Sequence, residues 1–106
     1  MKKLRNYDSA PWCSMEAALQ IMGGKWKGVI LYHLFKDGTL RFSELQRFMP
    51  SINQRLLTKQ LRELEEDGLV LRKVYAVVPP KVEYSLSEEG RELNKLVLDL
   101  SIWGRQ

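Results

Sequence analysis

The chain has 106 residues, of which 44% are hydrophobic and 28% charged, enough for one domain with a modest core. Its net charge of +4 and its pI near 9.3 are compatible with a polyanionic partner. No run of about 18 apolar residues is present, which argues against a membrane partner, and the basic amino terminus lacks the apolar core of a signal peptide. The single cysteine, Cys13, excludes a disulfide within the chain and indicates a cytoplasmic protein.

The amino-terminal segment divides into an arm and a first helix. Residues 1–12 are polar, so we expect a mobile arm, followed by one domain over residues 13–106. Ser14 is placed to cap a helix over Met15–Met22, and a Gly-Gly pair ends it.

The next segment predicts a central helix and then a short one. Apolar side chains surround nearly the whole of Lys25–Lys36, so this helix should lie at the centre of the domain. Thr39–Phe42 has the composition of a very short strand. Ser43 and Gln46 have the spacing of a capping box, which predicts a short helix from Ser43 to Met49.

Ser51–Gly68 is the most informative segment, because its charge is sorted by face and by end. At about 100° per residue, its basic and polar residues fall on one side and its leucines on the other. Ser51 is the expected N-cap and Gly68 the expected C′ residue. The basic side carries Arg55, Thr58, Lys59 and Arg62, the apolar side Leu57, Leu61 and Leu64, and the acidic end Glu63, Glu65, Glu66 and Asp67. By itself this pattern fits an ordinary amphipathic helix equally well.

A hairpin is predicted directly after this helix. Leu69–Ala76 and Lys81–Leu86 are rich in Val, Tyr and Leu, and VVPP between them forms the turn. The hairpin carries the cations Arg72, Lys73 and Lys81. A basic hairpin alone could be a solvated edge that charge protects from aggregation. Two helices joined by a tight turn and followed by a hairpin are, however, the parts of a winged helix-turn-helix.

The last helix, Glu88–Trp103, is capped by Ser87 and has apolar residues on two sides. One helix can bury one stripe on its own domain, so the second side needs a partner, for which a second subunit is the simplest choice. The alternative is a mostly buried helix in a monomer. The residues expected at the dimer interface are Leu93, Leu96, Val97, Leu100 and Trp103, while Leu98 and Ile102 lie on the other side.

The expected fold class is therefore α+β and mainly α, a winged helix-turn-helix with dimerisation helices at both ends. In this arrangement the chain resembles the HxlR-type winged-helix transcriptional regulators, bacterial relatives of the MarR regulators. The segments that carry the resemblance are IMGGKWKGVILYHL, RFSEL, INQRLLTKQLRELEEDGLV and VYAVVPPKVEYSLSEEG, within Cys13 to Trp103.

The resemblance implies a homodimer joined through its first and last helices, bound to a palindromic operator, usually as a repressor and sometimes as an activator. It also implies a possible role for Cys13, since several similar proteins sense electrophiles or oxidants through a cysteine at this place. A helix N-terminus stabilises a thiolate, whereas burial beside Trp12 and Met15 would oppose it. An inert cysteine at the dimer seam is the equal alternative. Without a second cysteine, the options are pairing with its symmetry mate, capping by a small thiol, or alkylation by a thiol-reactive small molecule.

On this reading, Ser51–Arg62 enters the major groove of double-stranded DNA. Arginine can bind guanine with two hydrogen bonds, and an amide can bind adenine. The wing would reach flanking phosphate or the minor groove, and the short helix a phosphate. The candidate DNA-binding residues are Ser43, Ser51, Asn53, Gln54, Arg55, Thr58, Lys59, Arg62, Arg72, Lys73 and Lys81.

Other function classes fit less well. The single histidine, His33, shares a helix face with apolar residues and has no metal-ligand spacing or nucleophile beside it, so we expect no enzyme, metal or cofactor. Gly23-Gly24 is a helix break rather than a phosphate loop. Two alternatives stay open: a winged helix used for protein–protein contact, and a DNA-binding regulator with a noncovalent effector.

Overall fold

The computed structural model describes residues 11–23 and 26–106. The predicted arm therefore lies almost entirely outside the described residues. Within the described residues, no helix is both long and apolar enough to cross a membrane. The elements in chain order are α1 (Pro11–Met22), α2 (Lys27–Asp37), β1 (Leu40–Arg41), α3 (Phe42–Phe48), α4 (Gln54–Glu66), β2 (Val70–Tyr75), β3 (Lys81–Leu86) and α5 (Glu88–Gly104).

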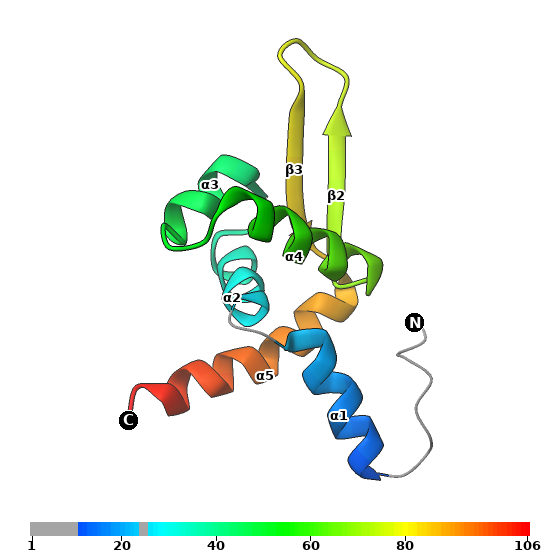
Figure 1. Cartoon of the computed structure of the whole chain (residues 1–106), viewed down its shortest axis with the longest axis vertical. Helices are drawn as coiled ribbons and strands as arrows, with labels where there is room; N and C mark the ends of the chain where they lie inside the picture. Colours follow the sequence, from blue (N-terminus) through cyan, green and yellow to red (C-terminus); the bar gives the residue numbers. More distant parts are fainter. Residues whose placement is uncertain (1–10, 24–25) are drawn as a thin grey trace.

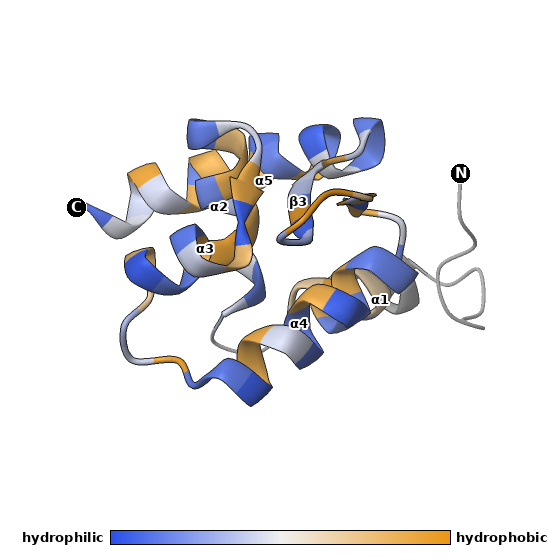
Figure 2. Cartoon of the chain, turned by 90° about the horizontal axis from the view of Figure 1, so that it is seen from above, coloured by the Kyte–Doolittle hydropathy of each residue, from blue (hydrophilic) through white to orange (hydrophobic). Residues whose placement is uncertain are grey.

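The core forms where α2 meets α4, α5 and the base of the sheet (Figure 1). The two central helices each contribute three leucine or isoleucine side chains that are at most 1% exposed: Ile30, Leu31 and Leu34 from α2, and Leu57, Leu61 and Leu64 from α4. Leu34 follows Leu31 by three residues and Ile30 by four, and the α4 leucines are also three or four residues apart, which places each set on one side of its helix. Figure 2 shows the consequence for α4, where hydrophobic and hydrophilic residues alternate along the ribbon. The prediction that α2 lies at the centre of the domain is confirmed for the side that carries Ile30, Leu31 and Leu34. Phe35, also on α2, is 46% exposed.

The strands form one antiparallel sheet in the order β1-β3-β2. Val70 pairs with Leu86 at its base, where both side chains are buried in the core. Beyond this pair, β2 and β3 extend away from the helices as the predicted wing (Figure 1). The wing tip is apolar and exposed, with Val78 at 99%.

Helix α4 starts later than predicted. Ile52 is buried in the core, which places the turn before α4 at residues 50–53, and Ser51 is an exposed turn residue. The N-cap is Asn53, whose Oδ1 accepts a 2.8 Å hydrogen bond from the Leu56 N–H. The C-terminal prediction is confirmed, because Gly68 adopts a φ of 79°, which glycine tolerates best.

Two other helix starts also differ from the sequence prediction. Helix α1 begins at Pro11, because proline is favoured in the first helical turn, so Ser14 lies inside the helix rather than capping it. Helix α3 begins at Phe42, and its cap comes from Glu44: Oε1 accepts a 2.8 Å hydrogen bond from the Arg41 N–H. The predicted Ser43–Gln46 capping box is therefore wrong.

Helix α5 is capped as predicted. Ser87 Oγ accepts a 3.0 Å hydrogen bond from the Gly90 N–H and donates a 2.6 Å hydrogen bond to the Gly68 carbonyl, joining the starts of the wing and of α5. The face of α5 towards the core carries Gly90, Asn94 and Val97. Val97 thus belongs to the chain's own core, and Leu93 is half-buried against it. Of the residues expected at the dimer interface, Leu96, Leu100 and Trp103 are exposed by 59%, 60% and 71%.

Candidate nucleic-acid interface

The outer face of α4 is a continuous cationic surface. Its side chains point away from the leucines that fix the helix to α2, so all of them are exposed to solvent. This surface, which we call the α4 face, is lined by Gln54, Arg55, Thr58, Lys59 and Arg62. It matches the basic side predicted from the sequence, with Gln54 added at its start.

Internal hydrogen bonds already occupy part of the polar groups around this face. Asn53 uses Oδ1 for the helix cap, which leaves its amide N–H groups as donors. The Thr58 hydroxyl donates a 2.8 Å hydrogen bond to the Gln54 carbonyl, so Oγ1 can still accept. Gln54, Arg55 and Lys59 therefore have the more freely available donors.

Of the three predicted wing cations, only Arg72 lies on the side of α4. Successive residues of a strand point to opposite faces, so Arg72 shares a face with the buried Val70, and Lys73 points the other way. A recess between α4 and the wing is lined by Thr58, Arg62, Glu65, Arg72 and Tyr84. Arg72 thus extends the α4 face onto the wing.

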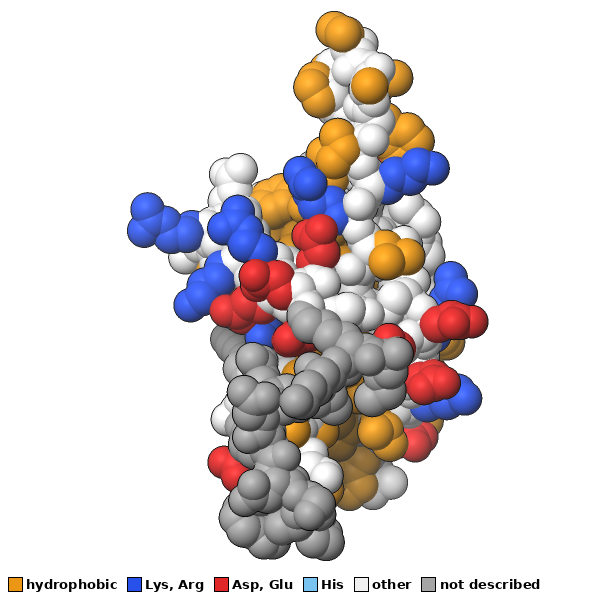
Figure 3. Space-filling model, turned by 90° about the vertical axis from the view of Figure 1, so that its right-hand side faces the viewer, with side chains coloured by type: hydrophobic (Ala, Val, Ile, Leu, Met, Phe, Trp, Pro, Cys, Tyr) orange, Lys and Arg blue, Asp and Glu red, His pale blue; other side chains and the backbone are white. Residues whose placement is uncertain are grey.

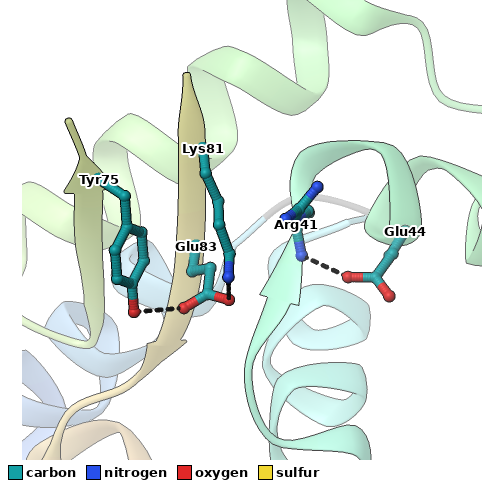
Figure 4. A network of polar contacts seen from close by, with 5 residues as sticks. All are labelled: Arg41, Glu44, Tyr75, Lys81 and Glu83. Carbon is teal, nitrogen blue, oxygen red and sulfur yellow. Dashed lines mark hydrogen bonds and ion pairs between the residues drawn. The ribbon is translucent and has the colours of Figure 1, made fainter. Parts of the chain in front are cut away.

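Lys73 and Lys81 belong to a separate group on the opposite face of the wing, and Figure 4 shows Tyr75, Lys81 and Glu83 of this group. We call Lys73, Tyr75, Lys81 and Glu83 the wing cluster. Glu83 accepts a 2.8 Å hydrogen bond from the Tyr75 hydroxyl and forms a 3.3 Å ion pair with Lys81. The ammonium groups of Lys73 and Lys81 lie 4.9 and 4.8 Å from the centre of the Tyr75 ring.

Glu83 therefore partly neutralises the far face of the wing. The hydrogen bond from Tyr75 lowers the pKa of Glu83, and Lys81 lowers it further, so the carboxylate is ionised at neutral pH. We did not identify Tyr75 and Glu83 from the sequence. The period of two along β3 could have indicated Glu83, because Lys81 and Glu83 are two residues apart and their side chains lie on the same face of the strand. Tyr75 becomes their neighbour only through the strand register.

The remaining predicted residues, Ser43 and Ser51, precede α4 in the chain and are exposed. Ser43 is exposed in the first turn of α3, and Ser51 in the turn before α4. Figure 3 shows Lys and Arg side chains projecting beside the base of the wing, whereas hydrophobic side chains gather at its tip. The tip residues 76–80 contain no cation, so charged contacts from the wing must come from nearer its base.

His33 is a core-edge residue, as the sequence indicates. Its ring stacks on Phe48 at the end of α3, with 4.6 Å between ring centres, and burial lowers its pKa. Within the described part of the chain, no three His, Cys, Asp or Glu residues are grouped so that they could hold a metal ion.

The structure thus combines a helix-turn-helix, a cationic second helix and a wing. The model of the HxlR-like helix-turn-helix family matches residues 21–106. This chain belongs to that family. HTH-type transcriptional regulator YybR of Bacillus subtilis is 53% identical to it over 103 residues, covering 97% of this chain and 82% of YybR.

Solved structures agree with this assignment. The structure of redox regulator HypR in its oxidised form has a TM-score of 0.84 and 57% identity, covering 88% of this chain and 95% of that one. A MarR-family transcriptional regulator from Enterococcus faecalis V583 has a TM-score of 0.80 and 40% identity, covering 98% and 92%. The chain is thus an HTH-type transcriptional regulator of the HxlR family, structurally related to the MarR regulators, and not an enzyme.

The two faces of the wing predict different roles for its cations in DNA binding. Arg72→Gln should weaken binding to mixed-sequence DNA and reduce the slope of log K against log salt by about one phosphate contact, because Arg72 extends the α4 face. Lys81→Gln removes the same charge from the wing cluster and should change the slope much less. Fluorescence titrations at several salt concentrations measure both slopes. Equal losses in the two variants would contradict this division of the wing.

Proposed function

We propose that this regulator binds an inverted-repeat DNA operator as a cytoplasmic homodimer, and that it acts as a repressor. The observation that carries the proposal is the α4 face, a cationic surface on the second helix of a helix-turn-helix. In this fold that helix enters the major groove, and a two-fold symmetric dimer places two such helices on two half-sites.

The chemistry of the α4 face suits recognition of base edges and phosphates. Arg55 lies in the first turn of α4, where recognition helices contact bases, and its guanidinium can bind guanine O6 and N7 together. Gln54 can serve adenine in the same way. Lys59 and Arg62 follow along the helix and supply cations for phosphates or bases. Glu65 and Glu66 are exposed at the far end, where α4 leaves the groove.

Exposed apolar side chains on the terminal helices support the dimer. Helices α1 and α5 extend from the lower side of the lobe, away from the wing (Figure 1). Large apolar side chains that stay exposed on a small chain are typical of a protein–protein interface. The exposed residues are Met15 and Leu19 on α1, and Leu96, Leu100, Ile102 and Trp103 on α5, each at least 54% exposed.

The two alternative functions, protein–protein contact and regulation by a noncovalent effector, would each require a different surface feature. A winged helix used for protein contact would present an apolar or acidic α4 face, whereas here the face carries Arg55, Lys59 and Arg62. A noncovalent effector would need a pocket, and an apolar cleft between α1 and α5, lined partly by Ile21 and Leu93, is compatible with one. An effector in that cleft would regulate the protein, and its presence would not argue against DNA binding by the α4 face.

Replacing Arg55 tests the groove assignment. Arg55→Gln should weaken binding to the duplex that the protein selects from a random pool by about 1–3 kcal/mol, because one bidentate base contact is lost. Arg91→Gln removes the same charge from an exposed position on α5 and should leave the affinity nearly unchanged. Anisotropy titrations of both variants give the comparison. Unaltered affinity in a folded Arg55→Gln variant would show that α4 does not read bases.

Replacing Leu100 tests the dimer. Leu100→Glu should convert the dimer to a monomer, because a carboxylate would be buried in an apolar interface. Leu71→Glu changes a leucine of similar exposure, 55%, on the wing and should leave the dimer intact. Light scattering behind a sizing column reports the mass of each. A dimeric Leu100→Glu variant would place the interface elsewhere.

A second proposal concerns Cys13 as a redox or electrophile sensor. Cys13 lies in the first turn of α1, where free N–H groups and the helix dipole stabilise a thiolate. The similar HypR is described as a redox regulator and has been solved in both an oxidised and a reduced form. With one cysteine per chain, oxidation would join Cys13 to that of the partner subunit or to a small thiol.

Oxidant treatment tests this second proposal. Diamide should lower the DNA affinity of the wild-type protein, and a reducing thiol should restore it, since the modified residue lies on a helix that we assign to the dimer contact. Cys13→Ser should bind DNA normally and lose the response. Gel shifts before and after diamide treatment measure the DNA affinity of the wild-type protein and of the Cys13→Ser variant. A Cys13→Ser variant that still responds to diamide would end the sensor proposal.

A further inference from the structure

Lys27 is a buried lysine at a place where its charge is unfavourable for its own helix. It is 5% exposed and is the first residue of α2. Burial removes water from the ammonium group, and the N-terminus of a helix carries partial positive charge. Neither helix formation nor burial favours a lysine at this position. We therefore look for the reason in its contact with another element.

That contact is with the recognition helix. Lys27 Nζ lies 2.8 Å from Glu63 Oε1 on α4, and the Glu63 side chain is 37% exposed. The surrounding recess is polar and is lined by Gln20 of α1 together with Lys27, Glu63, Glu66 and Asp67. The last turn of α4 is thus rich in carboxylates, which oppose the helix dipole at that end. Lys27 compensates this negative charge from the neighbouring helix.

The position of Glu63 on α4 connects this pair to the α4 face. Glu63 directly follows Arg62 and comes one helical turn after Lys59, both on the face that we propose reads DNA. The leucines on the opposite side fix α4 through hydrophobic burial, which has no directional preference and tolerates small rotations of a helix. A short ion pair between charged groups has a defined geometry.

We infer that the Lys27–Glu63 pair is a positioning device, which sets the rotation and height of α4 on α2 and so determines how well the α4 face fits its operator. Neither residue touches DNA. The inference rests on the proposed function, because it concerns discrimination between operator and other DNA.

Two variants test the inference in the full-length protein. Lys27→Met keeps the length and apolar packing of the side chain, and the double variant Lys27→Met/Glu63→Met removes both charges of the pair. The probes are the duplex that the wild-type protein selects from a random pool and mixed-sequence genomic DNA. Lys36→Met is the control, because it removes the same charge from an exposed position on the same helix.

We expect both variants to discriminate roughly tenfold less between the two DNAs, about the effect of one lost base contact. The salt dependence on mixed-sequence DNA should stay the same, because the α4 cations remain. The urea midpoint should not fall in the double variant, since apolar replacement of a buried ion pair is often neutral or stabilising. Lys36→Met should keep full discrimination.

Two results would overturn the inference. Either a folded Lys27→Met variant discriminates as well as the wild type, or the double variant regains full discrimination. The second result would mean that the balance of charge beside Glu63, and not the geometry of the pair, determines discrimination. If Lys27→Met does not fold, the double variant decides alone. A wild-type protein that shows no salt-dependent binding to either DNA would instead contradict the proposed function.

Discussion

The structure depends on the packing of the α4 leucines against α2. Leu57, Leu61 and Leu64 are buried against a helix that is itself at the centre of the core. Because side chains at this spacing share one side of a helix, burying them turns the polar residues of α4 outwards. The α4 face is a direct consequence of this burial, and the wing then follows from the turn that Gly68 makes.

Charge is distributed on this scaffold in a way that packing alone does not explain. Arg72 joins the α4 face, while Glu83 partly neutralises the cations on the other face of the wing. The carboxylates of α4 lie at its far end, where Lys27 contacts Glu63 from α2. The α4 face and the wing side next to it therefore carry four cations, Arg55, Lys59, Arg62 and Arg72.

The elements of the fold were predictable, because their signals are local. The leucine spacing of α4, the VVPP turn and the Ser87 cap each depend on residues close together in the sequence. The exact caps were less predictable, because the predicted caps Ser14, Ser43 and Ser51 are not the residues at which these helices begin. Burial of Ile52 decides between Ser51 and Asn53 as the cap of α4, and this is a tertiary effect.

Functional details that depend on pairing between elements could not be read from the sequence. The division of Arg72 from Lys73 and Lys81 requires knowing which face of the wing lies towards α4. The Lys27–Glu63 contact joins residues that are far apart in the sequence, so no local pattern singles out Lys27. Likewise, the burial of Val97 separates one residue of the predicted dimer stripe from its exposed neighbours.

The central claim is that two copies of α4 read two symmetric half-sites. A hydroxyl-radical footprint on the selected duplex tests it most directly. We expect two equivalent protected blocks on one face of the DNA, related by a two-fold axis and centred about 10 base pairs, or a multiple of one helical turn, apart. One asymmetric block would contradict it.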